Sequence, residues 1–403
     1  MSEMLNKREK HYCLILLAVM FFVSCTPKVK DDRVRVFSFP AESGNIAKGI
    51  SAAYAGLAEN HLFFMGGCNF PDVPASEGGA KEFYKTIYCT PIPTDNDTIL
   101  QWKKVGEIDN LSAYGVSVSM LGGIVMVGGT NGKKSLKTAD ILTYYADSME
   151  VTINPLPDLP VSLDNMGGAA TDTMIYIAGG NANGVPSNRV FLLDFTNLQQ
   201  EWVELPSFPG NPRVQPVCVV MKNPEGELAL YIFGGFSASV DGNAPSVSPN
   251  GYEYSFRRGS WREVLAPNIN GEELFFGGGA VAKINDTLAV FAGGVNKDIF
   301  LSALQREAKM KQAIEQNDAD LQEQLKHQAK DYMTQSPEWY KFNDKVVIYN
   351  SLRNKWEEIV VTPLTARAGA SLIHNNGVLY SIGGELKPGI RVAEVVAVEL
   401  QSY

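Results

Sequence analysis

The chain has 403 residues, a net charge of −9 and only 20% charged residues. It has no basic stripe with interleaved aromatic residues, which argues against nucleic acid as a partner. Once Cys13 and Cys25 near the N-terminus are set aside, three cysteines remain, so at most one disulfide can form. Cys68 and Cys89 could pair, but free buried thiols fit the sequence equally well.

The first residues have the pattern of a bacterial signal peptide. A basic start over residues 7–10 precedes an apolar run over 14–23, which is too short for a membrane-spanning helix of about 20 residues. A small residue stands directly before Cys25, as in a lipobox, so we expect a lipoprotein signal peptide over 1–24 and a lipid on Cys25. The alternative is a signal peptide with a chance cysteine. We expect a solvated tether over 25–32 and a periplasmic lipoprotein, anchored to the outer membrane through this lipid alone.

The remaining chain, residues 33–403, contains six copies of one pattern. Six apolar strands each end in a glycine doublet, and turn formers precede several of them, as a hairpin into that strand requires. Glycine permits a sharp turn and a close approach between packed sheets. The six segments are Leu62–Gly67, Ile124–Gly129, Ile175–Gly180, Leu230–Gly235, Leu288–Gly294 and Leu379–Gly384.

A lone tryptophan follows four of the doublets, and proline turns close two of the units. The tryptophans are Trp102, Trp202, Trp261 and Trp356. A strand ending in Gly-Gly, a further strand and then a strand with tryptophan resemble the kelch motif, whose four-stranded blades stack around a channel. We therefore predict an all-β fold, a six-bladed kelch-type β-propeller. Only one strand, 392–400, fits after the last doublet, so we expect 33–39 to complete that blade and leave no unpaired edge.

One segment breaks the pattern. Residues from about 301 to 340 are rich in Gln, Lys, Glu and Ala and have no β-branched run. This composition predicts a helical insertion between strands two and three of the fifth blade. Long insertions on a propeller face often serve as lids or partner surfaces. A solvated helical hairpin without such a role is the alternative.

The residues after the doublets and those at the starts of the first strands should share one rim, because the strands of a blade are antiparallel. The first set is Cys68, Thr130, Asn181, Phe236, Val295 and Glu385, and the second includes Lys48, Tyr114, Asn165, Arg213, Phe276 and Arg367. Asn296 and Arg391 lie in adjoining loops. One carboxylate, several guanidinium groups and amides at one mouth predict a site for an anionic small molecule. The alternatives are that the arginines brace loops, that Glu385 pairs with Lys387 or Arg391 on the surface, and that the asparagines only form turns.

The sequence lacks the residue patterns that several other kinds of enzyme require. Its four histidines form no metal-ligand cluster, so we expect neither a metal nor a cofactor. The Ser-x-Asp-x-Gly-x-x-Trp box of sialidases is absent, and no facing pair of carboxylates suggests glycoside hydrolysis. Neither Gly-x-Ser-x-Gly nor a phosphate-binding loop occurs.

Two loops resemble those of the bacterial N-acetylneuraminate epimerase (sialic-acid mutarotase) family. They are Gly293–Phe300, before the expected helices, and the sequence Gly-Glu-x-Lys-Pro-Gly-x-Arg at 384–391. Residues through 117 are similar to the C-terminal part of that family's usual arrangement, which implies a cyclically permuted branch. The resemblance implies that Glu385 is the acid/base residue and that Arg391 binds the substrate. Further expected substrate contacts are Arg213, Arg367 and Asn296.

The sequence departs from the family at Ser112, where an arginine is usual, and in the loop over 69–79. Our hypothesis is a mutarotase that interconverts the α and β anomers of N-acetylneuraminate by acid/base-assisted ring opening, with this sugar acid as its partner. One alternative is a non-enzymatic glycan- or partner-binding propeller of the cell envelope. Another is a lyase or isomerase that acts on a different sugar acid. No pattern in the sequence indicates an oligomeric state.

Overall fold

The computed structural model describes residues 32–400, except 40, 95, 198–200 and 239–241. The expected signal peptide (1–24), Cys25 and all but the last residue of the expected tether (25–32) therefore lie outside the described residues. Within the described ranges, none of the helices has both the length and the apolar character needed to cross a membrane.

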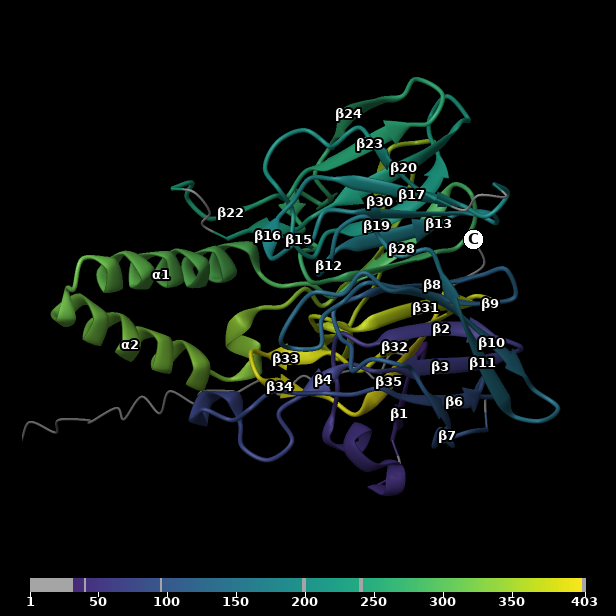
Figure 1. Cartoon of the computed structure of the whole chain (residues 1–403), viewed down its shortest axis with the longest axis horizontal. Helices are drawn as coiled ribbons and strands as arrows, with labels where there is room; N and C mark the ends of the chain where they lie inside the picture. Colours follow the sequence, from purple (N-terminus) through teal and green to yellow (C-terminus); the bar gives the residue numbers. More distant parts are fainter. Residues whose placement is uncertain (1–31, 40, 95, 198–200, 239–241, 401–403) are drawn as a thin grey trace, which may run out of the picture. The chain divides into compact units, whose positions relative to one another are not determined.

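Antiparallel β-sheets make up most of the regular secondary structure of the described chain, and six of these sheets have four strands each (Figure 1). The first three are β2-β3-β6-β7 (Tyr54–Ala58, His61–Met65, Thr86–Pro91, Lys103–Glu107), β8-β9-β10-β11 (Val116–Met120, Gly123–Val127, Ala139–Tyr145, Glu150–Leu156) and β13-β14-β17-β18 (Gly167–Ala170, Met174–Ala178, Val190–Asp194, Trp202–Leu205). The other three are β19-β20-β23-β24 (Val217–Lys222, Leu228–Phe233, Gly251–Ser255, Ser260–Val264), β27-β28-β29-β30 (Ala280–Lys283, Leu288–Ala292, Lys345–Asn350, Lys355–Val361) and β31-β32-β35-β1 (Ser371–Asn375, Val378–Ile382, Glu394–Glu399, Val34–Ser38).

Shorter elements occupy the connections between these strands. The short strands are β4 (Cys68–Asn69), β5 (Glu82–Phe83), β12 (Leu163–Asp164), β15 (Asn181–Ala182), β16 (Val185–Pro186), β21 (Phe236–Ser237), β22 (Ser246–Val247), β25 (Asn268–Ile269), β26 (Glu272–Glu273), β33 (Glu385–Lys387) and β34 (Ile390–Arg391). The helices are η1 (Ala41–Lys48), η2 (Ala75–Glu77), α1 (Lys297–Glu315), α2 (Ala319–Thr334), η3 (Pro337–Tyr340) and η4 (Pro363–Thr365).

The glycine doublets directly follow the second strand of every four-stranded sheet, as the sequence predicts. All of their φ angles are positive, between 62° and 103°. This left-handed region is open to glycine and costly for bulkier residues. Space is also short at these turns, since a Cβ on Gly384 would lie 2.9 Å from the Cβ of Ala370. The repeated doublet is therefore a requirement of the backbone.

A circle of main-chain hydrogen bonds joins the six sheets. One residue before each first strand donates its N–H to the carbonyl of the equivalent residue in the preceding sheet. The bonds run from Tyr114 to Ala52 (2.8 Å), Asn165 to Tyr114 (2.7 Å), Gln215 to Asn165 (2.7 Å), Gly278 to Gln215 (3.2 Å), Gly369 to Gly278 (2.8 Å) and Ala52 to Gly369 (2.8 Å). We call these six residues the peptide ring.

The peptide ring places the first strands around a common axis. All six of its residues have φ angles between 52° and 69°. Residues of all six first strands, β2, β8, β13, β19, β27 and β31, line one cavity of about 200 Å³ together with the ring. Such a radial arrangement of four-stranded sheets is a β-propeller-like fold.

Strand β1 joins the N-terminal end of the described chain to the last sheet. It pairs antiparallel with β35, with Val34 opposite Val398 and Phe37 opposite Val395. Phe37 is 1% exposed, whereas its neighbour Val36 is 39% exposed. Residues 33–39 thus pair as the sequence predicts, and both ends of the described chain contribute to one sheet.

Tryptophans of the outer strands contact proline turns of the preceding sheet. Trp202 Nε1 donates to the Pro157 carbonyl at 2.7 Å, and Trp261 Nε1 donates to the Pro206 carbonyl at 2.7 Å. The two local signals noted in the sequence, the tryptophan and the proline turn, are therefore the two halves of one repeated contact between sheets.

Helices α1 and α2 lie between β28 and β29 in the chain, and they extend side by side away from the sheets (Figure 1). Asn296 caps α1 by accepting the N–H groups of Asp298 and Ile299, and Asp318 caps α2 by accepting that of Leu321. Helix α1 contacts β22, and α2 contacts η2. The helices are thus held against loops of two other sheets.

The cysteines of the described chain are buried and unpaired. Cys68, Cys89 and Cys218 all have free thiols, so the alternative of free thiols holds over a Cys68–Cys89 disulfide. In the part of the chain that the structure describes, no group of three or more His, Cys, Asp or Glu residues could hold a metal ion.

Asp140, in β10, is a carboxyl group whose ionisation the fold opposes. Burial, and then the charges of Asp109 and Asp158, raise its pKa to about 6. Because this value exceeds the ordinary one of about 3.9, ionisation costs stability, and the cost grows as the pH rises from about 4 to about 6. We expect Asp140→Asn to raise the free energy of unfolding by about 1 kcal/mol at pH 7.5, a value reduced by partial exposure, and to have no such effect at pH 4. Urea unfolding at both pH values measures this, and an equal change at both would refute it.

Candidate active site

Glu385 and Arg391 face each other across a short hairpin. Glu385 begins β33, Arg391 ends β34, and the two residues are partners in the ladder. Arg391 Nη2 lies 2.8 Å from Glu385 Oε2, and the two side chains are 3% and 20% exposed, respectively. In the turn between them, the Gly389 N–H donates to Glu385 Oε1 at 3.0 Å. The hairpin thus fixes both oxygens of the carboxylate beside a buried guanidinium group.

Arg391 keeps one donor unused. Its Nε donates to Ser51 Oγ at 3.1 Å, and its guanidinium carbon lies 4.8 Å from the centre of the Phe70 ring. Its Nη1 is buried and has no hydrogen-bond partner among the described residues. A buried donor of this kind costs free energy unless a partner arrives. Nη1 is therefore the group that Arg391 can offer to an anionic ligand.

Burial raises the pKa of the Glu385 carboxyl. The charge of Arg391, the Gly389 N–H and the charge of Lys81 oppose the shift without cancelling it. A carboxyl group whose pKa lies closer to neutrality is better suited to accept and return a proton.

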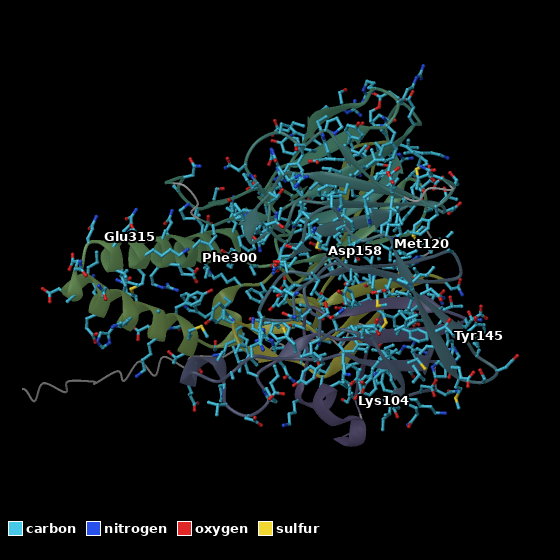
Figure 2. The ribbon with its side chains drawn as sticks, in the orientation of Figure 1. Lys104, Met120, Tyr145, Asp158, Phe300 and Glu315 are labelled. Carbon is cyan, nitrogen blue, oxygen red and sulfur yellow. The ribbon has the colours of Figure 1, made fainter. Side chains whose placement is uncertain are left out.

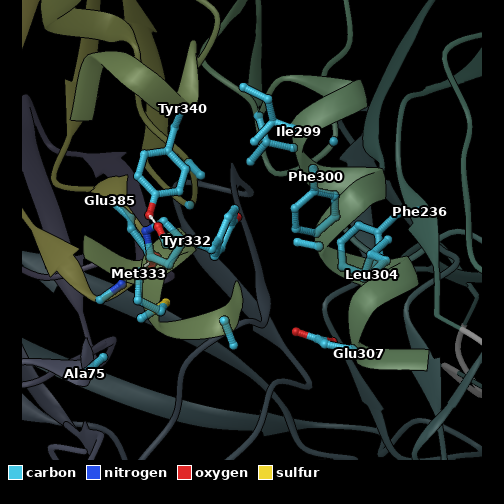
Figure 3. A pocket seen from close by; sticks show the side chains of 18 of the residues that line it. Ala75, Phe236, Ile299, Phe300, Leu304, Glu307, Tyr332, Met333, Tyr340 and Glu385 are labelled. Atoms are coloured by element: carbon cyan, nitrogen blue, oxygen red, sulfur yellow. Dashed lines mark hydrogen bonds between the residues drawn. The ribbon is translucent and has the colours of Figure 1, made fainter. Parts of the chain in front are cut away.

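The Glu385–Arg391 pair lines a cavity of about 760 Å³, large enough for a small molecule. Figure 3 shows one wall formed by α1, with Ile299, Phe300 and Leu304, and the facing wall formed by Tyr332, Met333, Tyr340 and Glu385. Ser51 and the ring residues Tyr114, Gln215 and Gly369 also line it. The cavity therefore has a polar end at the sheets and a largely apolar end between the helices.

The loop of Glu385 is tied to the helical segment. Lys387 Nζ donates to the carbonyls of Gln335, at 2.6 Å, and Met333, at 3.3 Å, at the C-terminal end of α2. A cation is favourable there, because the helix dipole places partial negative charge at this end. The hairpin and the helices are thus positioned together.

The structure gives Arg213 and Arg367 bracing contacts, and their expected role in substrate binding stays a prediction. The two side chains are buried, and neither lines the cavity of Glu385 and Arg391, whereas Arg367 lines a second cavity of about 800 Å³. Arg213 donates to the carbonyls of Gly234 and Asn250 at 3.1 and 2.8 Å. Arg367 likewise donates to those of Gly383 and Glu394 at 3.0 and 3.3 Å, and it pairs with the Glu394 carboxylate at 2.7 Å. Both arginines brace the glycine doublet of their own sheet, which was the alternative interpretation.

Asn296 lines the cavity, as expected, but it also has a structural role. Its Oδ1 accepts the N–H groups of Asp298 and Ile299, each at 3.1 Å. The carbonyl of this amide is therefore occupied as a helix cap, so its Nδ2 is the part of the side chain that a ligand would use.

The other rim residues separate into two groups. Tyr114, Phe236 and Val295 line the cavity with Glu385, whereas Cys68, Thr130, Asn165, Asn181 and Phe276 do not. Lys48 is also absent from the lining and lies 3.9 Å from Asp72, with both side chains half or more exposed. All six residues after the doublets nevertheless occupy equivalent places, because each is bonded to the residue directly before a residue of the peptide ring, and only some of them reach this cavity.

Sequence reasoning missed several residues of the cavity. Ser51, Phe70 and Lys81 come from the first sheet, and Arg306 and Glu307 come from α1. Ser51 directly precedes the ring residue Ala52, so its position relative to the first strand is a signal that could have found it. No local signal distinguishes Phe70 and Lys81, because they reach the cavity through an irregular loop.

The fold and the site define a β-propeller-like protein with a largely buried carboxylate–guanidinium pair at one end of its sheets. The sequence model of the N-acetylneuraminate epimerase family matches residues 156–403, which is more than half of the chain. The chain belongs to this family.

Two curated relatives agree with this assignment. The chain is 30% identical over 268 residues to the N-acetylneuraminate epimerase of Salmonella arizonae, covering 65% of this chain and 62% of the relative. It is 31% identical over 237 residues to that of Salmonella enteritidis, covering 59% and 56%. A solved structure titled "Structure of YjhT" is similar at 24% identity and a TM-score of 0.49, covering 61% of this chain and 65% of the other. The chain thus spans about three fifths of the length of the curated relatives that it matches.

Proposed function

We propose that this protein is a mutarotase that interconverts the α and β anomers of N-acetylneuraminate. The similar proteins are named for epimerisation of this sugar acid. The observation that carries the proposal is the Glu385–Arg391 pair, in which a proton-transfer group lies beside a guanidinium with a buried, unpartnered Nη1. The carboxylate of a sugar acid is a suitable partner for such a donor.

Anomer exchange needs ring opening, rotation about a bond and reclosure. Glu385 takes the proton of the anomeric hydroxyl, and the electrons of that O–H bond form the ketone. The bond from the anomeric carbon to the ring oxygen breaks, and the ring oxygen gains a proton. After rotation, the reverse steps close the ring on the other face of the ketone. The reaction breaks and re-forms one C–O bond and transfers protons without net oxidation or reduction, so acid and base groups can assist it without a redox cofactor or a metal.

We also propose that the six sheets are the blades of one closed kelch-type propeller, with α1 and α2 inserted in the fifth blade and β1 completing the sixth. The peptide ring supports this count, because its hydrogen bonds link six equivalent residues and return to the first. The family match begins at residue 156, at the end of β11. This boundary supports a cyclically permuted order in which the first two blades replace the usual C-terminal part.

For the N-terminal residues we propose a lipoprotein signal peptide over 1–24, a lipid on Cys25 and a periplasmic location at the outer membrane. The basic start, the short apolar run and the small residue before Cys25 support this. Cys25→Ser should release the protein from the membrane fraction of cells, and a variant that stays there would reject the lipid anchor.

Time-resolved proton NMR of freshly released α-N-acetylneuraminate tests the function. We expect the anomers to reach equilibrium orders of magnitude faster in the presence of the protein than in buffer alone. Binding of the sugar acid without faster exchange would instead indicate a glycan-binding propeller. Neither binding nor exchange would indicate a lyase or isomerase of another sugar acid, or a different partner.

Arg391→Met tests the binding role of the guanidinium. Removing a charge-assisted hydrogen bond should raise the Kd for N-acetylneuraminate by about 10- to 100-fold. The pKa of Glu385 should also rise further, because it loses its main opposing charge. Isothermal titration calorimetry measures the Kd, with Arg353→Met, at an exposed turn, as the matched control. An unchanged Kd in Arg391→Met would remove this residue from the binding site.

A further inference from the structure

A second polar pair lies in the same cavity, outside the Glu385–Arg391 hairpin. Lys81, directly before β5, and Tyr114, of the peptide ring, both line the cavity. Lys81 Nζ lies 3.1 Å from Tyr114 Oη. An ammonium group can only donate, so Tyr114 Oη accepts this bond and keeps its own proton to donate, with the Cys68 side chain as a second hydrogen-bonding neighbour. Tyr114 is therefore a hydroxyl donor held by a cation at the polar end of the cavity.

The Phe70 ring connects this pair to the first one. Lys81 Nζ lies 5.7 Å from the ring centre, and the guanidinium carbon of Arg391 lies 4.8 Å from the same centre. Both distances are typical of cations that interact with an aromatic ring. A carboxylate with its cation and a phenol with its cation are thus neighbours around one aromatic side chain.

The backbone at Tyr114 gives an independent reason to assign its side chain a role. Its φ angle of 59° lies in the left-handed region, which is unfavourable for a bulky residue. The other ring positions carry small or amide-bearing residues, namely Ala52, Asn165, Gln215, Gly278 and Gly369. The ring needs only the main chain of residue 114, so the hydrogen bonds of the ring do not account for a tyrosine there.

We infer that Tyr114 is the general acid of the anomer exchange and that Lys81 is the positioning residue that holds its hydroxyl. The inference rests on the proposed function. When the ring opens, Glu385 removes the anomeric proton, the electron pair of the breaking C–O bond goes to the ring oxygen, and Tyr114 gives that oxygen its proton. Lys81 stabilises the resulting phenolate. On closure, Tyr114 takes back the proton of the attacking hydroxyl and Glu385 returns its proton to the former ketone oxygen.

The surroundings of Tyr114 keep it in the required protonation state. The titratable groups around it are Lys81, Cys68, Glu385 and Arg391. Burial, and then Cys68 and Glu385, raise the pKa of the phenol, and Arg391 opposes this. Tyr114 is therefore protonated at neutral pH, and because the raised pKa makes the phenol a weaker acid, its proton transfer depends on Lys81 stabilising the phenolate.

Tyr114→Phe removes the proton and keeps the ring in place. We expect kcat for anomer exchange to fall by about 10²-fold, with KM changed by less than about threefold. Lys81→Met should lower kcat by about tenfold, and Lys81→Arg should restore part of it, since it keeps a donor and a charge. Tyr114 and Glu385 act in the same step. The double variant Tyr114→Phe/Glu385→Gln should therefore lower kcat by less than the product of the two single fold-changes.

Tyr145→Phe is the matched control, because Tyr145 is 51% exposed at the end of β10. Figure 2 shows it at the opposite side of the sheets from Phe300, which lines the cavity. If the wild type catalyses exchange and the kcat of Tyr114→Phe lies within threefold of the wild-type value, this inference is overturned, whereas the proposed function stands. Absence of exchange in the wild type would instead defeat the proposed function and this inference with it. Should Tyr114→Phe fail to fold, an unchanged kcat in Lys81→Met, at an exposed loop residue, would overturn it.

Discussion

Glu385→Gln is expected to slow anomer exchange by about 10²- to 10⁴-fold, the usual contribution of a positioned acid or base. The amide keeps the shape of the side chain and an acceptor for Arg391, so the Kd for N-acetylneuraminate should change by less than about threefold. Exchange measured by proton NMR and binding measured by calorimetry separate the two effects. Exchange at the wild-type rate would reject Glu385 as the base.

The pH dependence of exchange gives a second measure of the same residue. Because burial raises the pKa of Glu385, the low-pH limb of the wild-type rate should lie above the range of an ordinary glutamate. The rate should fall as the pH drops through that pKa, since the protonated carboxyl cannot act as a base. Glu399→Gln, at an exposed residue at the end of β35, should keep both the rate and this limb.

Phe37→Ala should destabilise the fold more than any surface change. Phe37 is 1% exposed and packs in a cluster that contains residues of both the first and the last sheet, such as Phe64 and Val395. Truncating a buried phenylalanine typically costs about 3–5 kcal/mol. Urea unfolding should show a loss of this size, because the strand that brings the two chain ends into one sheet loses its main contact.

Val36→Ala is the matched control within the same strand. Val36 is 39% exposed on the other face of β1, so we expect a change below about 0.5 kcal/mol. Equal unfolding midpoints for the two variants would show that β1 contributes little to the stability of the fold.

The strands and their turns are predictable from sequence because their signals are local. A glycine doublet indicates positive φ angles at one turn, and the alternation of apolar and polar residues indicates which face of one strand is buried. The pairing of residues 33–39 also follows, since the last repeat lacks a strand and an edge would remain unpaired. In each case the physical requirement lies within a few residues.

The site is only partly predictable because it depends on contacts between distant loops. Glu385 and Arg391 are found because they flank one short turn. Lys81 reaches the cavity through an irregular loop, and its contact with Tyr114 spans 33 positions of sequence. The periodic pattern of apolar residues along the sequence does not indicate such a contact.

Arg213 and Arg367 show how a binding residue and a bracing residue can look alike in sequence. Both are cations at the expected rim, yet main-chain carbonyls occupy them. A useful signal is that they recur at equivalent places in two repeats, where each contacts its own glycine doublet. A residue that recurs in several repeats is expected to stabilise the repeat. Arg391 has no counterpart in the other sheets, which indicates a role in one particular site.

The peptide ring separates the architecture from the chemistry. Its bonds involve only amides and carbonyls, so any residue that tolerates the left-handed backbone can occupy a ring position without breaking the circle. Three of these positions, at Tyr114, Gln215 and Gly369, border the cavity of Glu385 and Arg391. Exchanging one residue at such a position alters the reactive groups within reach of a substrate while the closure of the sheets is preserved, which makes these three positions a starting point for redesigning the specificity of the protein.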